Sequence, residues 1–340
     1  MAATGETNMR VVIQAFGGPD VLTVERGGAI PEPGDGEVLV RVEASSAAFT
    51  DIIIRKGLYP GLPEKPPFTL GYDMVGTVER NGSGADAFAP GTRVADLTTI
   101  GGQARFVCRR QDDLTIVPDG IAPVDAAALI LSYVTAWQML MRVAKVPQGG
   151  RILVHGAGGA VGTAMLELAR LNGFAAWGTD FPEKHDLISK LGGLPLDAGM
   201  DDLSSAIPGG VDAAFDPLGG ASYARSLDVV KPGGMLVGYG FLEQALGHGG
   251  SIPMDFIKLR LWDWLPNGHA TAFYSIGAMR RKHPAWFHED LSHLFALLAQ
   301  GRLTPTIEKT LPMEQVRAAH EAIEAGEVRG KIVLLPWGEA

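Results

Sequence analysis

The sequence contains a single cysteine, Cys108, among 340 residues, and no cluster of positive charge. One cysteine excludes a disulfide within the chain and a multi-cysteine metal site, which is typical of a reducing compartment. We therefore expect the protein in the cytoplasm. The formal net charge of −9 and the lack of any Lys and Arg run argue against a nucleic-acid partner, because phosphate binding needs clustered positive charge.

Long apolar runs and export signals are missing as well. No stretch of about 18 uncharged apolar residues occurs, and the polar residues 1–8 have neither the basic nor the apolar part of a signal peptide. We expect no membrane span, and we interpret residues 1–8 as a disordered extension.

The chain instead has 46% hydrophobic residues, 45 glycines and 22 prolines. This composition, over this length, predicts a two-domain α/β enzyme with many loops rather than a coiled coil or a disordered chain. The expected partners are small molecules.

Short β-rich runs punctuated by glycine and proline extend from Met9 to about Pro118. They predict a strand-rich, barrel-like unit. The expected strands are Arg10–Ala15, Glu37–Ala44, Asp73–Arg80, Arg93–Ala95 and Ala104–Val107.

After Pro118 an apolar helix is expected over Val124–Arg142, and buried strands then alternate with helices, which predicts a parallel, doubly wound sheet. The expected segments are Arg151–His155, Ala160–Asn172, Ala175–Thr179, Glu183–Leu191, Ala213–Asp216, Tyr223–Val230 and Met235–Tyr239. Beyond them we expect a strand at Ile257–Trp262, helices at Asp290–Gln300 and Glu314–Ala325, and a strand at Lys331–Leu335 that rejoins the first domain.

A glycine-rich turn joins the first of these strands to a helix. Small residues there let the backbone approach a pyrophosphate at the helix N-terminus, where free N–H groups favour anions. The turn consists of Gly156, Ala157, Gly158, Gly159, Ala160, Val161 and Gly162. It predicts a dinucleotide site; the alternative, a tight turn chosen only for packing, leaves the following strand and acid unexplained.

That acid is Asp180, which follows the second strand. A carboxylate at this place accepts hydrogen bonds from ribose hydroxyls and repels a 2′-phosphate, so Asp180 favours NADH. Lys184 and His185 lie close enough in sequence to keep NADPH possible. The alternative role of Asp180 is a helix N-cap ahead of Pro182.

Several motifs together resemble the quinone oxidoreductase branch of the medium-chain dehydrogenase/reductase superfamily, which includes the vesicle-amine-transport-like proteins. The motifs are FGGPDVL at 16–22, PGDGEVLVRVEA at 33–44, DIIIRKGLYPG at 51–61, GYDMVGTV at 71–78, HGAGGAVG at 155–162, FDPLGG at 215–220, KPGGMLVGYG at 231–240 and GEVRGKIVLLP at 326–336. The resemblance implies a GroES-like catalytic β-barrel domain, residues 9–128 with 264–340, and a Rossmann domain, residues 129–263. It also implies NAD(P)H as the cofactor, with NADPH the more common choice of the family.

Zinc-dependent relatives hold a catalytic metal with two cysteines and a histidine. The matching positions here are Ala48, Tyr72 and Leu131, and none of these is a usual zinc ligand. The four-cysteine structural lobe is absent too. We therefore expect no metal site.

Without a metal, the resemblance implies transfer of a hydride from the nicotinamide to a quinone or an α,β-unsaturated carbonyl. Family members often use an asparagine and one or more tyrosines to stabilise the oxygen that gains charge, but Ala48 replaces that asparagine. The candidate donors are Tyr59, Tyr72 and Tyr133, each of which could also be an ordinary packing residue. Asp51 and Arg55 are expected to support the segment around them.

The resemblance also places cofactor contacts outside the glycine turn. Thr135 could instead bond back to its own helix, and Lys331 could be a solvated charge. The expected contacts are Thr135, Asp180, Lys184, Gly219, Gly238, Tyr239, Gly240 and Lys331.

The sequence thus predicts an NAD(P)H-dependent quinone or enone reductase. The alternatives are an enoyl-thioester reductase of a polyketide or fatty-acid pathway and a non-catalytic dinucleotide-binding protein. We expect a homodimer in which an edge strand at Lys258–Trp262 pairs with its symmetry mate. The aromatic run Trp262-Asp263-Trp264 is interpreted as core or subunit interface, or as the lining of an apolar pocket.

Overall fold

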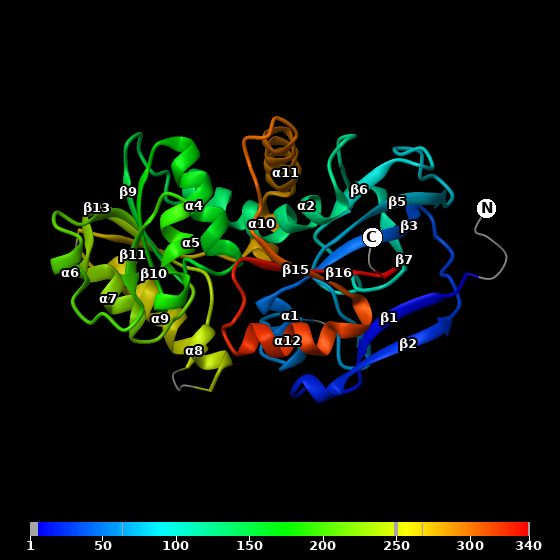
Figure 1. The fold of residues 1–340 in the computed structure, drawn as a ribbon, viewed down its shortest axis with the longest axis horizontal. Helices are drawn as coiled ribbons and strands as arrows, with labels where there is room; N and C mark the ends of the chain where they lie inside the picture. The colour runs from blue at the N-terminus through cyan, green and yellow to red at the C-terminus, as the bar shows by residue number, and fades with distance from the viewer. Residues whose placement is uncertain (1–5, 63, 248–250, 267, 339–340) are drawn as a thin grey trace. The chain divides into compact units, whose positions relative to one another are not determined.

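The computed structural model describes residues 6–62, 64–247, 251–266 and 268–338 (Figure 1). The chain divides into two compact units, and the boundaries fall after Leu131 and Pro284. Unit 1 contains the N-terminal part with Ala285–Ala340, and unit 2 is Ser132–Pro284. The second boundary differs from the predicted one at residue 264, because a further strand and helix before Pro284 belong to unit 2.

Unit 1 is built from antiparallel β-structure. One sheet has the order β15-β16-β3-β5-β6-β8, with β7 paired to β3, and a smaller sheet has the order β2-β1-β4. Alternate residues of β3 point to the core, as its period of two requires. The strands are β1 (Asn8–Ile13), β2 (Leu22–Gly28), β3 (Glu37–Ala47), β4 (Phe68–Thr69), β5 (Met74–Asn81), β6 (Arg93–Asp96), β7 (Phe106–Arg110), β8 (Thr115–Ile116), β15 (Ile307–Pro312) and β16 (Lys331–Leu335). The helices are α1 (Phe49–Arg55), α2 (Pro123–Ala128), α11 (Pro284–Ala299) and α12 (Val316–Glu324).

The extension predicted for residues 1–8 is wrong for its last residues. Residues 1–5 lie outside the described residues, but Asn8 already belongs to β1. Its side chain donates to the Phe106 carbonyl and accepts from the Phe106 N–H, at 3.1 and 3.0 Å. Glu6 forms an ion pair with Arg41 at 2.9 Å. These polar residues have defined partners that a sequence pattern does not reveal.

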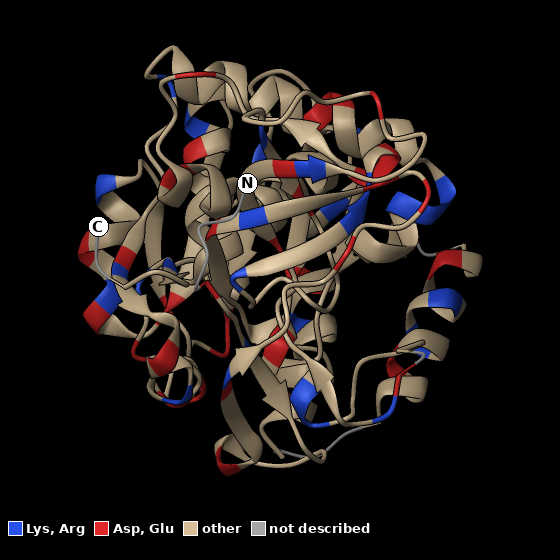
Figure 2. Cartoon of the chain, turned by 90° about the vertical axis from the view of Figure 1, so that its right-hand side faces the viewer, with Lys and Arg blue, Asp and Glu red and all other residues tan. Residues whose placement is uncertain are grey.

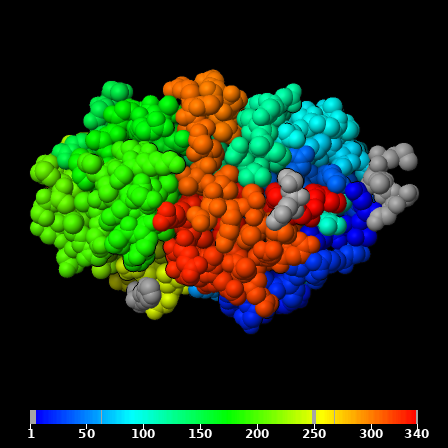
Figure 3. All heavy atoms as spheres, in the orientation of Figure 1, coloured from blue at the N-terminus to red at the C-terminus, as the bar shows by residue number. Residues whose placement is uncertain are grey.

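The C-terminal segment returns to the first unit. Strand β16 pairs antiparallel with β3 and parallel with β15, so residues 331–335 join the large sheet. In the space-filling view the C-terminal part, orange to red, lies against blue N-terminal residues (Figure 3). Trp337 follows β16 and donates to the Val42 carbonyl at 2.7 Å.

Unit 2 is a parallel six-stranded sheet of order β11-β10-β9-β12-β13-β14. Counted along the chain this is 3-2-1-4-5-6, the Rossmann order, in which ligands bind at the carboxyl ends of the strands beside the reversal between β9 and β12. The strands are β9 (Arg151–His155), β10 (Ala175–Asp180), β11 (Leu194–Asp197), β12 (Val211–Asp216), β13 (Val230–Gly238) and β14 (Ala270–Phe273).

Helices cover both faces of this sheet. Side chains of α6, α7 and α9 form one core cluster with β9, β12 and β13, and α4 packs on β9 and β10. The helices are α3 (Val134–Trp137), α4 (Ala160–Asn172), α5 (His185–Lys190), α6 (Leu203–Ala206), α7 (Ser222–Asp228), α8 (Leu242–Ala245), α9 (Ile252–Trp264) and α10 (Ile276–Lys282). The predicted α/β class with a parallel, doubly wound sheet is confirmed.

The strand predicted at Ile257–Trp262 is wrong, because these residues lie within helix α9. The helix begins after Ser251 with a proline in its first turn, a start signal that the apolar and aromatic residues obscured. The edge strand is β14 instead, so Lys258–Trp262 cannot be the edge that pairs with a second copy.

The predicted apolar helix is observed over Pro123–Val143, with π-helical turns at Leu129–Tyr133 and Gln138–Val143. It is long and apolar enough to cross a membrane, but most of it is buried inside the folded chain, as in the core helix of a globular protein. Figure 2 shows Lys and Arg interspersed with Asp and Glu, so the face in view carries charges of both signs.

A buried histidine on α12 gives a prediction for acid stability. His320 is fully buried with no hydrogen-bond partner for either ring nitrogen among the described residues, and burial together with nearby Arg55 lowers its pKa to about 3. In the unfolded chain the His320 side chain binds a proton with a pKa near 6.5, whereas in the folded chain it stays neutral until a much lower pH. Stability therefore falls as the pH drops below 6.5.

Between pH 7 and pH 5, His320 should lower the unfolding free energy of the wild type by about 2 kcal/mol. We expect this part of the loss to be absent in His320→Leu. The measurement is urea unfolding at several pH values. Equal slopes for wild type and His320→Leu would contradict the assignment.

Candidate functional site

The glycine turn has the geometry of an anion-binding helix start. Strand β9 ends at His155, Gly156 adopts a left-handed conformation with φ of 65°, and helix α4 begins after Gly159. The first N–H groups of a helix have no acceptor within it, and α4 is 13 residues long, so its dipole is well developed. The turn therefore presents N–H donors at the carboxyl end of the sheet.

Two glycines of the turn leave no room for a side chain. A Cβ atom on Gly162 would lie 2.3 Å from the Gly156 carbonyl oxygen and 2.5 Å from the Ala157 Cα. A Cβ atom on Gly158 would lie 2.5 Å from the Cδ of Lys184. The backbone of this turn thus packs closely on its own first residues and on the segment after β10.

Asp180 lies against the turn at the end of β10. Its Oδ2 accepts from the Gly158 N–H at 2.8 Å, and its Oδ1 accepts from the Phe181 N–H at 2.9 Å. The ammonium of Lys184 lies 3.8 Å from Asp180 Oδ1, and both residues are largely buried. The predicted acid and the predicted cation therefore form one charged pair beside the turn.

The FDPLGG turn after β12 contains a second acid, Asp216. This buried carboxylate accepts from Ser222 and Ser226, both at 2.7 Å, and from the Leu218 N–H at 2.8 Å. Gly219 of this turn has φ of 83°, a conformation that favours glycine.

His155 extends this network. Its two ring nitrogens lie 2.7 Å from Thr179 Oγ1 and 2.9 Å from Ser226 Oγ. Burial lowers the His155 pKa, which favours the neutral ring, and the ring links the ends of β9 and β10 to helix α7. These contacts give His155 a structural role.

The remaining predicted contacts of unit 2 also lie at strand ends or in the long helix. Gly238 ends β13, Tyr239 donates its backbone N–H to the Asp216 carbonyl at 3.0 Å, and Gly240 accepts from Tyr223 at 3.2 Å. The buried hydroxyl of Thr135 has no hydrogen-bond partner among the described residues. Such a group is an unused donor and acceptor for a bound molecule.

Two of the three candidate tyrosines meet in unit 1. The hydroxyls of Tyr59 and Tyr72 lie 2.5 Å apart, and the rings are in edge contact with centroids 5.8 Å apart. Tyr72 is buried and Tyr59 is partly exposed. We call these residues the tyrosine pair.

The third tyrosine lies elsewhere. Tyr133 belongs to unit 2 and donates to Glu167 Oε2 of α4 at 2.5 Å. Both residues are buried. The structure thus directs the Tyr133 proton to a carboxylate, a partner that sequence reasoning missed because the two residues are 34 positions apart.

The positions that bind zinc in relatives have other roles here. Ala48 precedes α1 and donates its N–H to Asp51 at 2.9 Å, Tyr72 belongs to the tyrosine pair, and Leu131 is buried. Alanine and leucine offer no side-chain donor to a metal. Within the described residues no group of three or more His, Cys, Asp or Glu could hold an ion.

Lys331 lies in a buried cluster of unit 1 rather than on a solvated strand start. Its ammonium is 3.8 Å from Asp73, whose carboxylate also accepts from the Ser46 N–H at 2.7 Å and bonds the Ser46 hydroxyl. Burial lowers the Lys331 pKa and raises that of nearby Asp51 to about 7. Arg55 forms an ion pair with Glu324 at 2.8 Å, so α1 is supported as expected.

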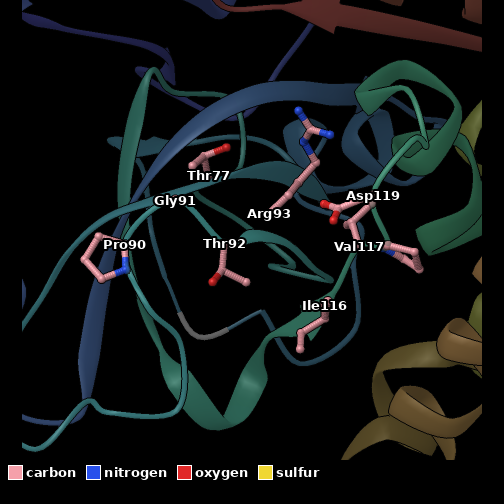
Figure 4. A pocket seen from close by; sticks show the side chains of 9 residues that line it. Thr77, Pro90, Gly91, Thr92, Arg93, Ile116, Val117 and Asp119 are labelled. Carbon is pink, nitrogen blue, oxygen red and sulfur yellow. The ribbon is translucent and has the colours of Figure 1, made fainter.

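Two further features bear little on the site. The Cys108 thiol is half-buried in β7, and burial raises its pKa to about 11, so the unreactive thiol form dominates at neutral pH. A surface pocket in unit 1 contains no predicted site residue (Figure 4). Its lining is Thr77, Pro90, Gly91, Thr92, Arg93, Ile116, Val117, Pro118 and Asp119.

The residues of unit 2 fit a dinucleotide. The turn at Gly156–Gly162 provides the N–H groups and the close backbone approach that a pyrophosphate needs, Asp180 and Lys184 flank it, and the Thr135 hydroxyl is unused. The sequence located these residues correctly relative to the strands.

Two family profiles match the chain. The alcohol dehydrogenase GroES-like domain matches residues 34–147, and the zinc-binding dehydrogenase profile matches residues 195–334.

Individual relatives align over nearly the whole chain. The synaptic vesicle membrane protein VAT-1 homolog of Rattus norvegicus is 30% identical, and the alignment covers 97% of this chain and 84% of the relative. The quinone oxidoreductase of Pongo abelii is 29% identical, with 98% and 99% covered. A mycobacterial protein solved in complex with NADPH has a TM-score of 0.85 and 27% identity, with 96% of this chain and 100% of that chain covered.

Proposed function

Because the chain belongs to the zinc-independent quinone oxidoreductase branch of the medium-chain dehydrogenase/reductase superfamily, we propose that it reduces quinones or α,β-unsaturated carbonyls with NADH or NADPH. The observation that carries the proposal is the tyrosine pair. Tyr72 of this pair is at a position that matches a metal ligand of zinc-dependent relatives, and the proposal is that a phenol of the pair, instead of a metal, stabilises charge on the acceptor.

The two phenols differ in burial, and we propose a different task for each. Either hydroxyl of the pair could be the donor in their mutual hydrogen bond. Because Tyr72 is buried and Tyr59 is partly exposed, we propose that Tyr72 donates to the Tyr59 oxygen and that Tyr59 directs its own proton to the acceptor. A hydroxyl that accepts a hydrogen bond becomes a stronger donor, because the two bonds polarise each other. Tyr59 is thus the proposed catalytic donor, and Tyr72 positions and polarises it.

The nicotinamide supplies the hydride when bound. Its transfer would place the hydride on the electron-poor carbon of the acceptor and negative charge on the acceptor's oxygen. Tyr59 stabilises that oxyanion by a hydrogen bond, and a proton from water completes the reduced product. The protein itself needs no redox-active residue for this step.

The test is nicotinamide oxidation by the purified full chain with ortho-quinones, short enones and a crotonyl thioester. We expect turnover of quinones or enones. Turnover of the thioester alone would identify an enoyl-thioester reductase instead. Nucleotide binding without turnover of any acceptor would identify a non-catalytic protein and refute the proposal.

The Asp180–Lys184 pair gives a prediction about nucleotide choice. Lys184 is the cation beside Asp180, and its stem packs on the turn, so its charge can compensate a 2′-phosphate. We expect Lys184→Met to weaken NADPH binding about 10-fold, since a charge-assisted bond contributes about 1.5–3 kcal/mol. NADH binding should change little. Fluorescence titration with each nucleotide measures the two dissociation constants and so their ratio.

Asp180→Asn is the matched variant with the opposite expected effect, because it removes the negative charge that repels the 2′-phosphate of NADPH. It should shift the preference towards NADPH. If both variants change NADH and NADPH affinity equally, the pair does not select the nucleotide.

A further inference from the structure

Three charged side chains of unit 1 are buried together beside the segment that carries Tyr72. The exposed fractions of Asp51, Asp73 and Lys331 are 0%, 0% and 3%. The Lys331 ammonium lies 3.8 Å from Asp73 Oδ2, and the charges of Asp73 and Lys331 both act on Asp51. The three residues come from different places in the chain, because Asp51 lies in α1, Asp73 precedes β5 and Lys331 begins β16. We call them the buried charge cluster.

The cluster contacts the backbone on both sides of Tyr72. The N–H of Gly71 interacts with the Asp51 carboxyl. On the other side, Asp73 Oδ1 accepts from the Ser46 N–H of β3 at 2.7 Å. The residues before and after Tyr72 are therefore both tied to the charged groups of the cluster.

The charges within the cluster do not balance. Two carboxylates and one ammonium leave one negative charge in excess when all three groups are ionised. Arg55 lies one turn further along α1, but it forms an ion pair with Glu324 at 2.8 Å and so does not make up the difference. Asp51 Oδ1 is buried and has no hydrogen-bond partner among the described residues. A buried, unbalanced charge on an unbonded oxygen is costly, and a bound proton removes that cost.

The pKa of Asp51 agrees with this count of charges. Burial raises the pKa to about 7, although the Ala48 N–H opposes the rise. Of the neighbouring charges, that of Asp73 raises the pKa and that of Lys331 lowers it. Below about pH 7 Asp51 is therefore protonated and the cluster is neutral. Above that pH Asp51 ionises, and the cluster carries a net negative charge.

We propose that the buried charge cluster holds one proton at neutral pH and that loss of this proton slows the reduction at the tyrosine pair. The inference rests on the proposed function, in which the acceptor oxygen gains negative charge beside Tyr59. A second negative charge in the same unit opposes that change. The proton moves between Asp51 and solvent as the pH changes and is not passed to the product. Asp51 acts on the acceptor only through its charge, so it is a positioning residue.

The test is the pH dependence of kcat for the full chain with its best acceptor, from about pH 6 to about pH 8.5. We expect the wild-type kcat to fall about 10-fold with a midpoint near pH 7. Asp51→Asn cannot ionise, so it should keep the high value and be faster than the wild type at the alkaline end. A purely structural role predicts a loss of activity at every pH instead. Variant and wild type are compared at each pH, so effects of pH on the nucleotide and the acceptor cancel.

Two further variants test the assignment of the charges. Asp73→Asn removes the negative charge that raises the pKa of Asp51, so the midpoint should move to lower pH. Asp125→Asn changes a carboxyl of α2 outside the cluster. It is the matched control and should keep the wild-type midpoint.

Infrared spectroscopy provides a readout that needs no turnover. We expect the wild type to lose the carbonyl band of a protonated carboxyl with a midpoint near pH 7, whereas Asp51→Asn should lack this change. Ordinary carboxyl groups titrate near pH 4 and do not interfere. The proposal is overturned if the wild type lacks this titration, if Asp51→Asn retains it, or if the two proteins have the same pH profile of kcat. A titrating band in a wild type that reduces no acceptor would support the bound proton and refute the proposed function.

Discussion

Tyr59→Phe is expected to lower turnover of the best acceptor about 100-fold while NADPH affinity stays within about twofold. A well-placed donor to a developing oxyanion contributes about 2.7–4 kcal/mol. The variant removes the proposed donor together with its hydrogen bond to Tyr72, while the phenylalanine ring keeps the edge contact with the Tyr72 ring. The loss should fall on kcat rather than on KM, since the charge develops only in the transition state.

Tyr72→Phe separates the two phenols. It leaves the Tyr59 donor in place but removes its partner at 2.5 Å, so we expect a smaller loss, about 10-fold, than for Tyr59→Phe. Tyr133→Phe is the control, because that hydroxyl is bonded to Glu167. Stopped-flow and steady-state assays measure all three, and full activity of Tyr59→Phe would remove the proposed role.

Gly162→Ala is expected to weaken binding of both nucleotides at least about 100-fold, which corresponds to about 2.7 kcal/mol. The new methyl group would lie 2.3 Å from the Gly156 carbonyl oxygen and 2.5 Å from the Ala157 Cα. These are backbone atoms, so relief requires the turn itself to open, and the N–H groups that face a pyrophosphate then move apart. Isothermal titration with NADH and NADPH gives the affinities.

Gly159→Ala is the matched control within the same turn. Its Cβ would meet only the Gly156 carbonyl oxygen, at 3.3 Å, and its φ of −82° suits any residue. The thermal midpoint of this variant should stay close to that of the wild type, while Gly162→Ala loses stability. Comparable binding by wild type and Gly162→Ala would contradict the assignment of the turn.

The nucleotide site was predictable because its signals are local. The turn at Gly156–Gly162 follows a strand, opens a helix and precedes an acid, and each of these features depends on residues near it in sequence. Strands β9 and β16 and helix α4 were placed with their exact bounds for the same reason.

Long-range pairs were not predictable in this way. Tyr59 and Tyr72 were named, but nothing in the sequence showed that their hydroxyls meet. The partners of Tyr133 and Lys331 are residues that only the fold brings together.

The error at α9 has a specific cause. Periodicity alone could not separate a strand from a helix in a segment rich in apolar and aromatic residues on several sides. The deciding signal was Ser251 with the proline that follows it, which starts the helix.

The most direct test of the central claim follows the hydride itself. The wild-type protein is given an enone and nicotinamide nucleotide deuterated at C4, and the product is examined by NMR. Our account predicts deuterium at the β-carbon of the product and a proton from water at the α-carbon. A product without deuterium from the nucleotide, or no product while the nucleotide remains bound, would contradict it.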